Sequence, residues 1–195
     1  MLVPGHLTSH DELEHVGVAA ESWWWWGCSA DGSSGLFVGL QLRGRRFDYR
    51  TGLWRAGRRC VYVEELDGTG RRAGLELKPA EMWADHVCDD PYRQWSVGNE
   101  AHGVLLDDPH DALARPYGTP VPVTFDIEWY AVGGPQAVEG GYEQVGGIDA
   151  EVQLTEGVVR LEGPAHRLHV WGPMPSPDSQ VMLTRVGFLA PTVDH

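Results

Sequence analysis

The sequence is short of basic residues. Fifteen Lys and Arg residues stand against 28 Asp and Glu residues in the 195-residue chain, so the formal net charge is -13. Only one of the basic residues is a lysine, Lys78. A chain without a basic face cannot neutralise phosphates well. We therefore expect neither nucleic acid nor an anionic membrane surface as a partner.

Cysteine is also scarce. The three cysteines, Cys28, Cys60 and Cys88, are widely spaced and odd in number, which fits neither a disulfide framework nor a paired zinc motif. Reduced thiols of this kind are typical of a cytoplasmic protein. The N-terminus lacks the basic and apolar pattern of a signal peptide, and no apolar stretch reaches the length of a membrane span. These absences predict a cytoplasmic location.

Helix signals are few. Ser9-His10-Asp11-Glu12 resembles a capping box with Ser9 as the N-cap, which predicts a short helix through about Val16. Asp108 to Ala114 has the only other helical pattern. The rest of the chain carries almost no helix-forming periodicity.

Strand signals fill the remaining sequence, which has 25 glycines, 13 prolines and nine tryptophans. Closely spaced short strands without crossover helices favour an antiparallel sandwich or barrel, and a barrel leaves no unpaired edges. We therefore predict one all-β domain over 1–195, with an N-terminal helical extension over 1–20 and an antiparallel barrel of about eight to ten strands over 21–190. The expected strands are 21–26, 36–42, 47–54, 60–66, 75–77, 82–88, 93–97, 121–131, 142–154, 158–162, the strand of His169 and 180–189.

The segment 163–172 concentrates the most chemistry, because it holds an arginine, two histidines and a tryptophan between two glycines. Side chains alternate across a strand, so Arg167, His169 and Trp171 are predicted to share one face. His166 then points to the opposite face and cannot chelate one ion together with His169. No other histidine spacing indicates a metal, so we expect no metal site.

The run Trp23-Trp24-Trp25-Trp26 places bulky indoles on both faces of one predicted strand. Each indole buries roughly 150–250 Å², which is too much apolar surface to leave in water. The run therefore predicts a strand between the core and an outer cover, such as the N-terminal helix or another protomer. Alternatively, one pair of indoles lines an apolar pocket that binds flat hydrocarbons or stabilises positive charge.

Acidic residues near the middle of the chain leave two interpretations open. In the segment 123–130, apolar residues alternate with Asp126 and Glu128, so these acids lie in water if the apolar face is core. If they point inward instead, Asp126 or Glu128 is a candidate general acid with a raised pKa. The same choice applies to Glu143, which would alternatively be a buried partner of Arg167.

Four short motifs, taken together, resemble a group of bacterial lipocalin-related barrel proteins that includes hydroxyneurosporene synthase (carotenoid 1,2-hydratase) and the barrel-type Diels–Alderases. The motifs occur in the same order: 21–24 (ESWW), 125–129 (FDIEW), 142–147 (YEQVGG) and 166–172 (HRLHVWG). The signature of that group is close to Arg-Asp-His-Ser-Trp-Gly, so Leu168 and Val170 replace its aspartate and serine here. That difference puts aspartate-dependent chemistry in doubt.

The resemblance implies a lipocalin-like barrel similar to the first barrel of the two-barrel members. A homodimer would then supply what the second barrel supplies in those proteins. It also implies an isomerase, cyclase or hydratase of secondary metabolism that uses no cofactor and acts on a hydrophobic polyketide or isoprenoid. The expected catalytic residues are His169, Arg167, Glu143, Glu128 and Asp126, and the expected substrate-binding residues are Trp23, Trp25, Trp129, Trp171, Trp95, Tyr130 and His86.

Two other interpretations remain open at this stage. The same barrel would serve as a carrier of an apolar small molecule without any chemistry. Alternatively, Arg167, His169 and Glu143 would form a buried structural network, and the protein would act only by association.

Overall fold

The structure, a computed structural model, describes residues 6–72, 74–172 and 179–189. Within these residues the chain is mainly antiparallel β-sheet, as the sequence predicts. The strands are β1 (Ala20–Cys28), β2 (Ser34–Arg43), β3 (Arg46–Arg55), β4 (Val61–Gly68), β5 (Met82–Asp90), β6 (Gln94–Leu106), β7 (Gly118–Ala131), β8 (Gln136–Val138), β9 (Gly141–Leu154) and β10 (Gly157–Gly172). The helices are the 3₁₀ turns η1 (Ser9–Glu12) and η2 (Pro109–Leu113) and the α-helix α1 (Ser179–Arg185).

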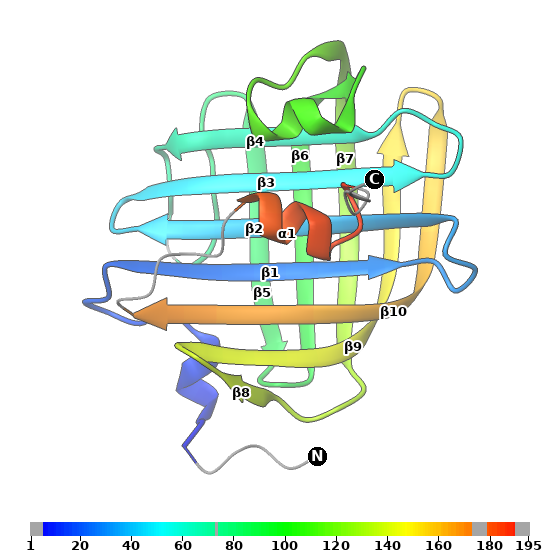
Figure 1. The fold of residues 1–195 in the computed structure, drawn as a ribbon. Helices are drawn as coiled ribbons and strands as arrows, with labels where there is room; N and C mark the ends of the chain where they lie inside the picture. The colour runs from blue at the N-terminus through cyan, green and yellow to red at the C-terminus, as the bar shows by residue number, and fades with distance from the viewer. Residues whose placement is uncertain (1–5, 73, 173–178, 190–195) are drawn as a thin grey trace, which may run out of the picture.

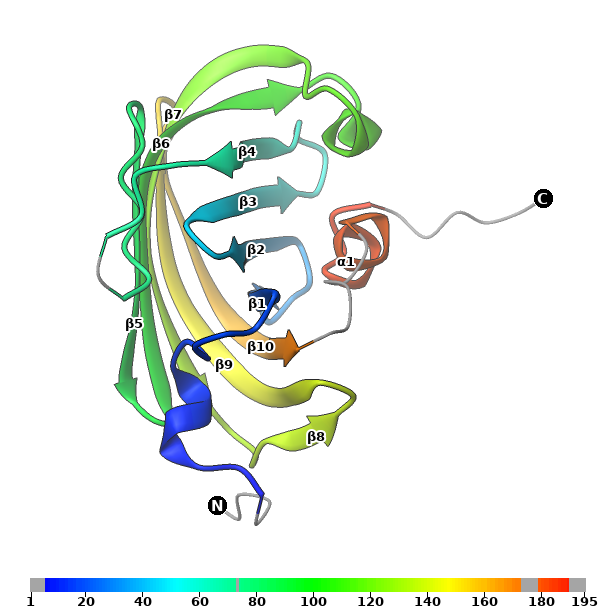
Figure 2. The same ribbon diagram turned by 90° about the vertical axis from the view of Figure 1, so that its left-hand side faces the viewer.

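The sheet closes on itself through eight strands. Its order is β10-β1-β2-β3-β4-β6-β7-β9, and β10 also pairs with β9, while β5 pairs with β6 and β8 with β9. Figure 1 shows β10 and β1 to β4 running across β5, β6 and β7 behind them. In Figure 2 the two sets of strands are seen as two curved layers. The residue alternation of these strands therefore decides which side chains lie between the layers.

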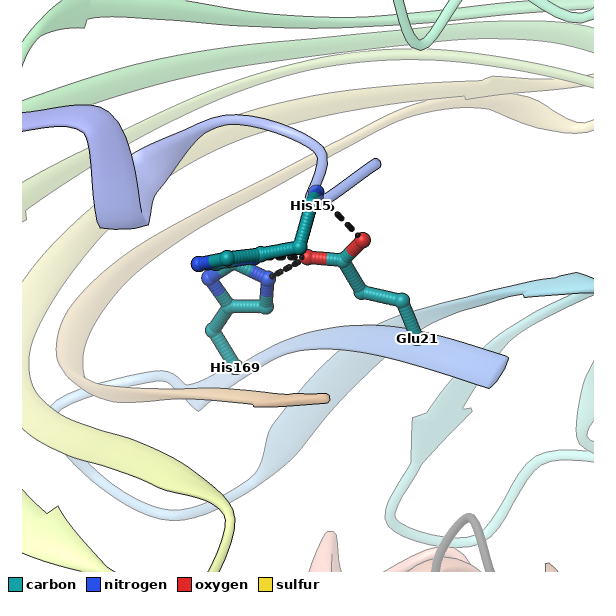
Figure 3. A group of neighbouring side chains, drawn as sticks. All are labelled: His15, Glu21 and His169. Carbon is teal, nitrogen blue, oxygen red and sulfur yellow. Dashed lines mark hydrogen bonds and ion pairs between the residues drawn. The ribbon is translucent and has the colours of Figure 1, made fainter. Parts of the chain in front are cut away.

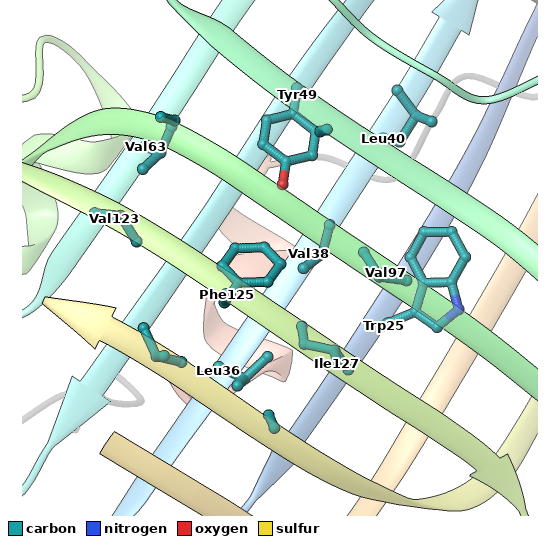
Figure 4. Close-up of a cluster of buried hydrophobic side chains, with 14 of the residues drawn as sticks. Trp25, Leu36, Val38, Leu40, Tyr49, Val63, Val97, Val123, Phe125 and Ile127 are labelled. Carbon is teal, nitrogen blue, oxygen red and sulfur yellow. The ribbon is translucent and has the colours of Figure 1, made fainter. Parts of the chain in front are cut away.

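The main core lies between the two layers. Figure 4 shows Val38 and Leu40 beneath the crossing strands that carry Val97, Phe125 and Ile127. The apolar face predicted for 123–129 belongs to this core, since these four alternating residues are at most 4% exposed. Asn99, a buried polar residue in this core, has partners on both sides: it accepts from Tyr49 Oη at 3.1 Å and donates to the Val123 carbonyl at 3.1 Å.

A second apolar cluster covers the outer side of β1. Trp23 and Trp25 face the main core, whereas Trp24 and Trp26 face outward and pack with residues of α1. All four indoles are at most 8% exposed. The prediction of a strand between a core and an outer cover is therefore confirmed. The cover is α1, which lies in front of β2 and beside β1 in Figure 1, and not the N-terminal helix.

The C-terminal prediction of a strand over 180–189 is wrong, because Ser179 to Arg185 is helical. Met182, Leu183 and Val186 are buried, and this i, i+1, i+4 spacing lies on one face of a helix. Gly163 and Pro164, expected to separate two strands, lie inside the continuous β10.

The N-terminal helix is shorter than predicted, and its cap differs. Thr8 is the N-cap of η1, and its backbone N–H donates to Asp11 Oδ2 at 2.6 Å. Glu12, predicted to reach back to the cap, is completely buried instead. Among the described residues, no helix has both the length and the apolar character needed to cross a membrane.

Candidate functional site

The face predicted for the last strand is confirmed. Arg167 and His169 of β10 are both completely buried between the layers, and Trp171 lies beside them and is half-buried. His166 is exposed on the opposite face. The strand thus points a guanidinium and an imidazole into the interior at the end of the sheet that η1 covers (Figure 2).

Arg167 is neutralised by Glu12, a partner that lies 155 residues away in the sequence. Its Nη1 and Nη2 donate to the two carboxylate oxygens of Glu12 at 2.8 and 2.7 Å. The same carboxylate accepts from Trp95 Nε1 at 2.7 Å and from Tyr142 Oη at 2.6 Å. This bidentate geometry is the strong form of a charged hydrogen bond. Arg167 is therefore paired with Glu12, and not with Glu143.

Aromatic rings surround the Arg167 guanidinium. Its central carbon lies 5.3, 5.0 and 5.1 Å from the ring centres of Trp95, Trp129 and Tyr142. Cation–π attraction of this kind is strongest for a desolvated cation. Gln144 adds an acceptor, since its Oε1 lies 3.1 Å from Nη2. The guanidinium is thus held from several sides by Glu12, Gln144 and three aromatic rings.

His169 forms a second buried pair with Glu21 of β1. Its Nε2 lies 2.7 Å from Glu21 Oε1, and Figure 3 shows the imidazole and the carboxylate facing each other between β10 and β1. The ring stacks on Trp23 with a centroid distance of 4.4 Å. Its Nδ1 is buried and has no hydrogen-bond partner among the described residues. The contact fixes one nitrogen and leaves the other with an unused lone pair.

His15 completes this cluster from the loop after η1. Its Nδ1 lies 2.7 Å from Glu21 Oε1, and its backbone N–H donates to Glu21 Oε2 at 2.9 Å. Its Nε2 faces Asp11 Oδ1 at 3.2 Å, and its ring stacks on Trp171 at 4.1 Å. The Glu21 carboxylate is therefore shared by two imidazoles, and each imidazole packs against an indole.

The charge states of the two buried pairs follow from opposing effects. Burial alone would raise the pKa of Glu12, but the Arg167 guanidinium outweighs burial and holds that pKa below its ordinary value. Burial also acts to raise the pKa of Glu21, and the hydrogen bonds from His169 and His15 outweigh it. For His169, burial lowers the pKa despite the opposing effect of Glu21. At neutral pH a carboxylate therefore faces a neutral His169, whose proton lies on Nε2.

The residues that could hold a metal ion are His15, Glu21 and His169. One donor atom from each lies within 4.8 Å of the others. Both imidazole contacts to Glu21 measure 2.7 Å, which is the length of a hydrogen bond. In this arrangement Glu21 Oε1 is bonded to both imidazoles and not to an ion. The prediction that His166 and His169 cannot share an ion agrees with their placement on opposite faces.

Several predicted site residues lie elsewhere. Asp126, Glu128 and Tyr130 are exposed on the outer face of β7. The interpretation that the two carboxylates lie in water is therefore the correct one. Glu143 is half-buried on the outer side and pairs with Arg185 at 2.5 Å. The hypothesis that these groups face the interior is wrong, because the alternation of β7 and β9 sends the neighbouring apolar residues inward.

His86 and the predicted indoles do belong to the interior. His86 stacks on Trp25 at 5.3 Å, and its Nδ1 lies 3.0 Å from the Leu75 carbonyl. Trp25 in turn contacts Trp95 at 5.2 Å. Together with Trp23 and Trp129, which are wholly buried, these side chains form one aromatic group around Arg167 and His169.

The prediction of an open, tryptophan-lined chamber is wrong for this conformation. Where the layers enclose space beside Phe125, the cavity measures about 10 Å³, roughly the space for one water molecule. The indoles and the Arg167–Glu12 pair occupy the other end. A ligand larger than a water molecule therefore enters the interior only if side chains move.

Glu12, Glu21 and His15 were not among the predicted site residues. One signal was present for Glu21, because strand alternation places it on the same face as Trp23 and Trp25. No local pattern marks Glu12 or His15 as partners of a strand that lies about 150 residues further on.

Comparison with known proteins adds no identification. No protein-family model matches the chain, and no curated protein matches it.

Proposed function

We propose that the chain is an enzyme with a single lipocalin-like barrel that acts on a hydrophobic polyketide or isoprenoid. The reaction is a proton transfer that leads to isomerisation, cyclisation or hydration, and His169 is the group that moves the proton. One observation carries the proposal: His169 is buried and neutral, is oriented through Nε2 by Glu21, and has an unpartnered Nδ1.

The geometry has the features of a general base. Glu21 Oε1 accepts a hydrogen bond from the Nε2–H of His169, and this contact favours the tautomer in which the Nδ1 lone pair is free. When Nδ1 takes a proton from the substrate, the adjacent carboxylate stabilises the resulting imidazolium, as the carboxylate does in a catalytic triad. The proton then returns to another atom of the substrate, so the enzyme is unchanged at the end of the cycle.

The surrounding rings suit an apolar substrate. Trp23 and Trp171 lie at 4.4 and 4.8 Å from the His169 ring. Indole faces bind flat hydrocarbon and stabilise a developing positive charge. Access requires the segment of η1 and His15 to move, because it covers this end of the sheet in Figure 2. Closure by that segment afterwards separates the bound substrate from bulk solvent.

The test is proton exchange into the substrate in D₂O, followed by mass spectrometry across a panel of polyketides and isoprenoids. We expect His169→Ala to lower the rate by about 10²–10⁴-fold, the contribution of general acid–base catalysis. Glu21→Gln should lower it as well, because the amide no longer selects the tautomer. His166→Ala, an exposed histidine on the same strand, is the matched control and should keep the full rate.

Two outcomes would overturn the proposal. Unchanged exchange in His169→Ala would remove this residue from the mechanism. Recovery of every bound ligand unaltered and without deuterium would show that the protein is a carrier.

A further inference from the structure

The Glu12 carboxylate lies in a site that the sheet builds around it. Arg167, Trp95 and Tyr142 come from β10, β6 and β9, and together they direct four hydrogen bonds of 2.6–2.8 Å at the two carboxylate oxygens. Glu12 itself belongs to η1, outside the sheet. The strands thus supply every donor, and the N-terminal segment supplies only the acid.

This end of the interior has more donors than acceptors. The Nε1 atoms of Trp23, Trp25 and Trp129 and the Nε of Arg167 are buried without a hydrogen-bond partner among the described residues. The unpartnered acceptors beside them are ring nitrogens of His86 and His169. Buried donors without partners are uncommon and costly, and each calls for an explanation. This end of the interior therefore suits a ligand whose polar group is an acceptor.

The segment that carries Glu12 is held to the sheet by side-chain contacts rather than by strand pairing. Glu14 pairs with Arg71, and the Nδ1 and backbone N–H of His15 contact Glu21. Besides Glu12, Leu7 packs in a small cluster with Tyr92 and Tyr142, and the Thr8 carbonyl accepts from Tyr92 Oη at 2.6 Å. Leu13 and Val16 on the same segment are 54% and 99% exposed. A four-residue 3₁₀ turn is also a weak element by itself. The segment is therefore suited to leave the sheet as a unit.

We propose that the ligand of this site is a hydrophobic carboxylic acid, whose carboxylate replaces that of Glu12 on Arg167, Trp95 and Tyr142. The apolar chain of the acid then lies among the buried indoles, in the space that the N-terminal segment vacates. Glu12 occupies the site of the ligand carboxylate when no ligand is bound.

The placement also connects this site with the proposed reaction. The Tyr142 ring lies 5.1 Å from the Arg167 guanidinium and 5.5 Å from the His169 ring. The carboxylate site and His169 are therefore neighbours of the same tyrosine ring, and the carbon chain of the acid would extend from one toward the other. This part of the inference rests on the proposed function, whereas binding of the acid does not.

The experiment compares decanoate with decanamide, which has the same chain but no charge. Titration calorimetry on the full-length chain should give decanoate an affinity at least about tenfold higher, since one charged hydrogen-bonding group is worth that much or more. Glu12→Ala should tighten decanoate by a further factor of about ten or more, because the competing carboxylate is gone. His10→Ala, at an exposed position of the same segment, should change nothing.

A second variant keeps the test decisive if Glu12→Ala does not fold. Tyr142→Phe removes one donor and should reduce the preference for decanoate over decanamide by about five- to tenfold. Equal affinity for the two ligands in the wild-type chain and in every folded variant overturns the inference. The binding experiment does not measure turnover, so it can fail independently of the exchange experiment in D₂O. Tight decanoate binding without proton exchange refutes the proposed function alone. Proton exchange without a preference for the carboxylate refutes this inference alone.

Discussion

Replacing Glu12 with glutamine should destabilise the fold strongly. Both side chains of the Glu12–Arg167 pair are 0% exposed, so the variant leaves a buried guanidinium without a counter-charge. Breaking such a pair on one side costs about 3–5 kcal/mol. For a chain of this size each kcal/mol lowers the melting temperature by about 2–4 °C, so a fall of about 6–20 °C is expected.

Urea denaturation followed by tryptophan fluorescence measures this loss. The matched control is Glu151→Gln, which breaks the exposed pair with Arg160, whose side chains are 52% and 80% exposed; it should cost at most about 1 kcal/mol. The double variant Glu12→Met/Arg167→Met should regain much of the stability, because no unpaired charge remains. A loss below about 1 kcal/mol in Glu12→Gln would refute the view that Glu12 neutralises Arg167 in the folded chain.

Three further predictions concern pH, metal and the outer cover. Burial lowers the pKa of His86 to about 4, whereas the unfolded chain has the ordinary value of about 6.5. Between about pH 6.5 and 4 the unfolded chain therefore binds one more proton at this residue than the folded chain does. The free energy of unfolding then falls by up to about 1.4 kcal/mol per pH unit as the pH drops. His86→Asn should flatten that dependence in urea titrations at pH 7 and 5, and an unchanged slope would contradict the assignment. Removal of divalent metal with EDTA should leave the melting temperature unchanged, because Glu21 already bonds His15 Nδ1 and His169 Nε2. A fall reversed by Zn²⁺ would show instead that the three residues form a metal centre. Leu183→Ala should cost about 2–5 kcal/mol, because Leu183 is fully buried on the inner face of α1. Val181→Ala, on the exposed side of the helix (Val181 is 60% exposed), should cost about 0.5 kcal/mol. Equal costs would show that α1 does not cover β1 in solution.

Features that depend on the period of a strand could be predicted from the sequence. The shared face of Arg167 and His169 follows from alternation alone, and so does the two-sided burial of the tryptophan run. Alternation also puts Asp126 and Glu128 on the face opposite the apolar residues, but the structure was needed to show which face is core. The C-terminal helix could have been recognised by the helical spacing of Met182, Leu183 and Val186. It was predicted as a strand because its apolar residues also suit a strand.

The partners of the buried charges could not be predicted in the same way. Glu12 stands in a local pattern that is typical of a capping box, and Thr8 with Asp11 supplies that cap instead. Tertiary contacts with Arg167 decide where Glu12 lies, and no local rule contains them. The volume left between the indoles could not be predicted either, since it depends on the angle at which the two layers of strands cross.

The most direct test of the account is a crystal structure of the chain with decanoate. We expect the decanoate carboxylate to lie within hydrogen-bond distance of Arg167 and Tyr142, and its alkyl chain to lie against Trp129 and near the His169 ring. Glu12 should be displaced from the interior. The contrary result is a structure in which Glu12 still pairs with Arg167 and decanoate lies in the outer groove of about 270 Å³ between Trp26 and Arg185 of α1. That result would contradict the proposed carboxylate site.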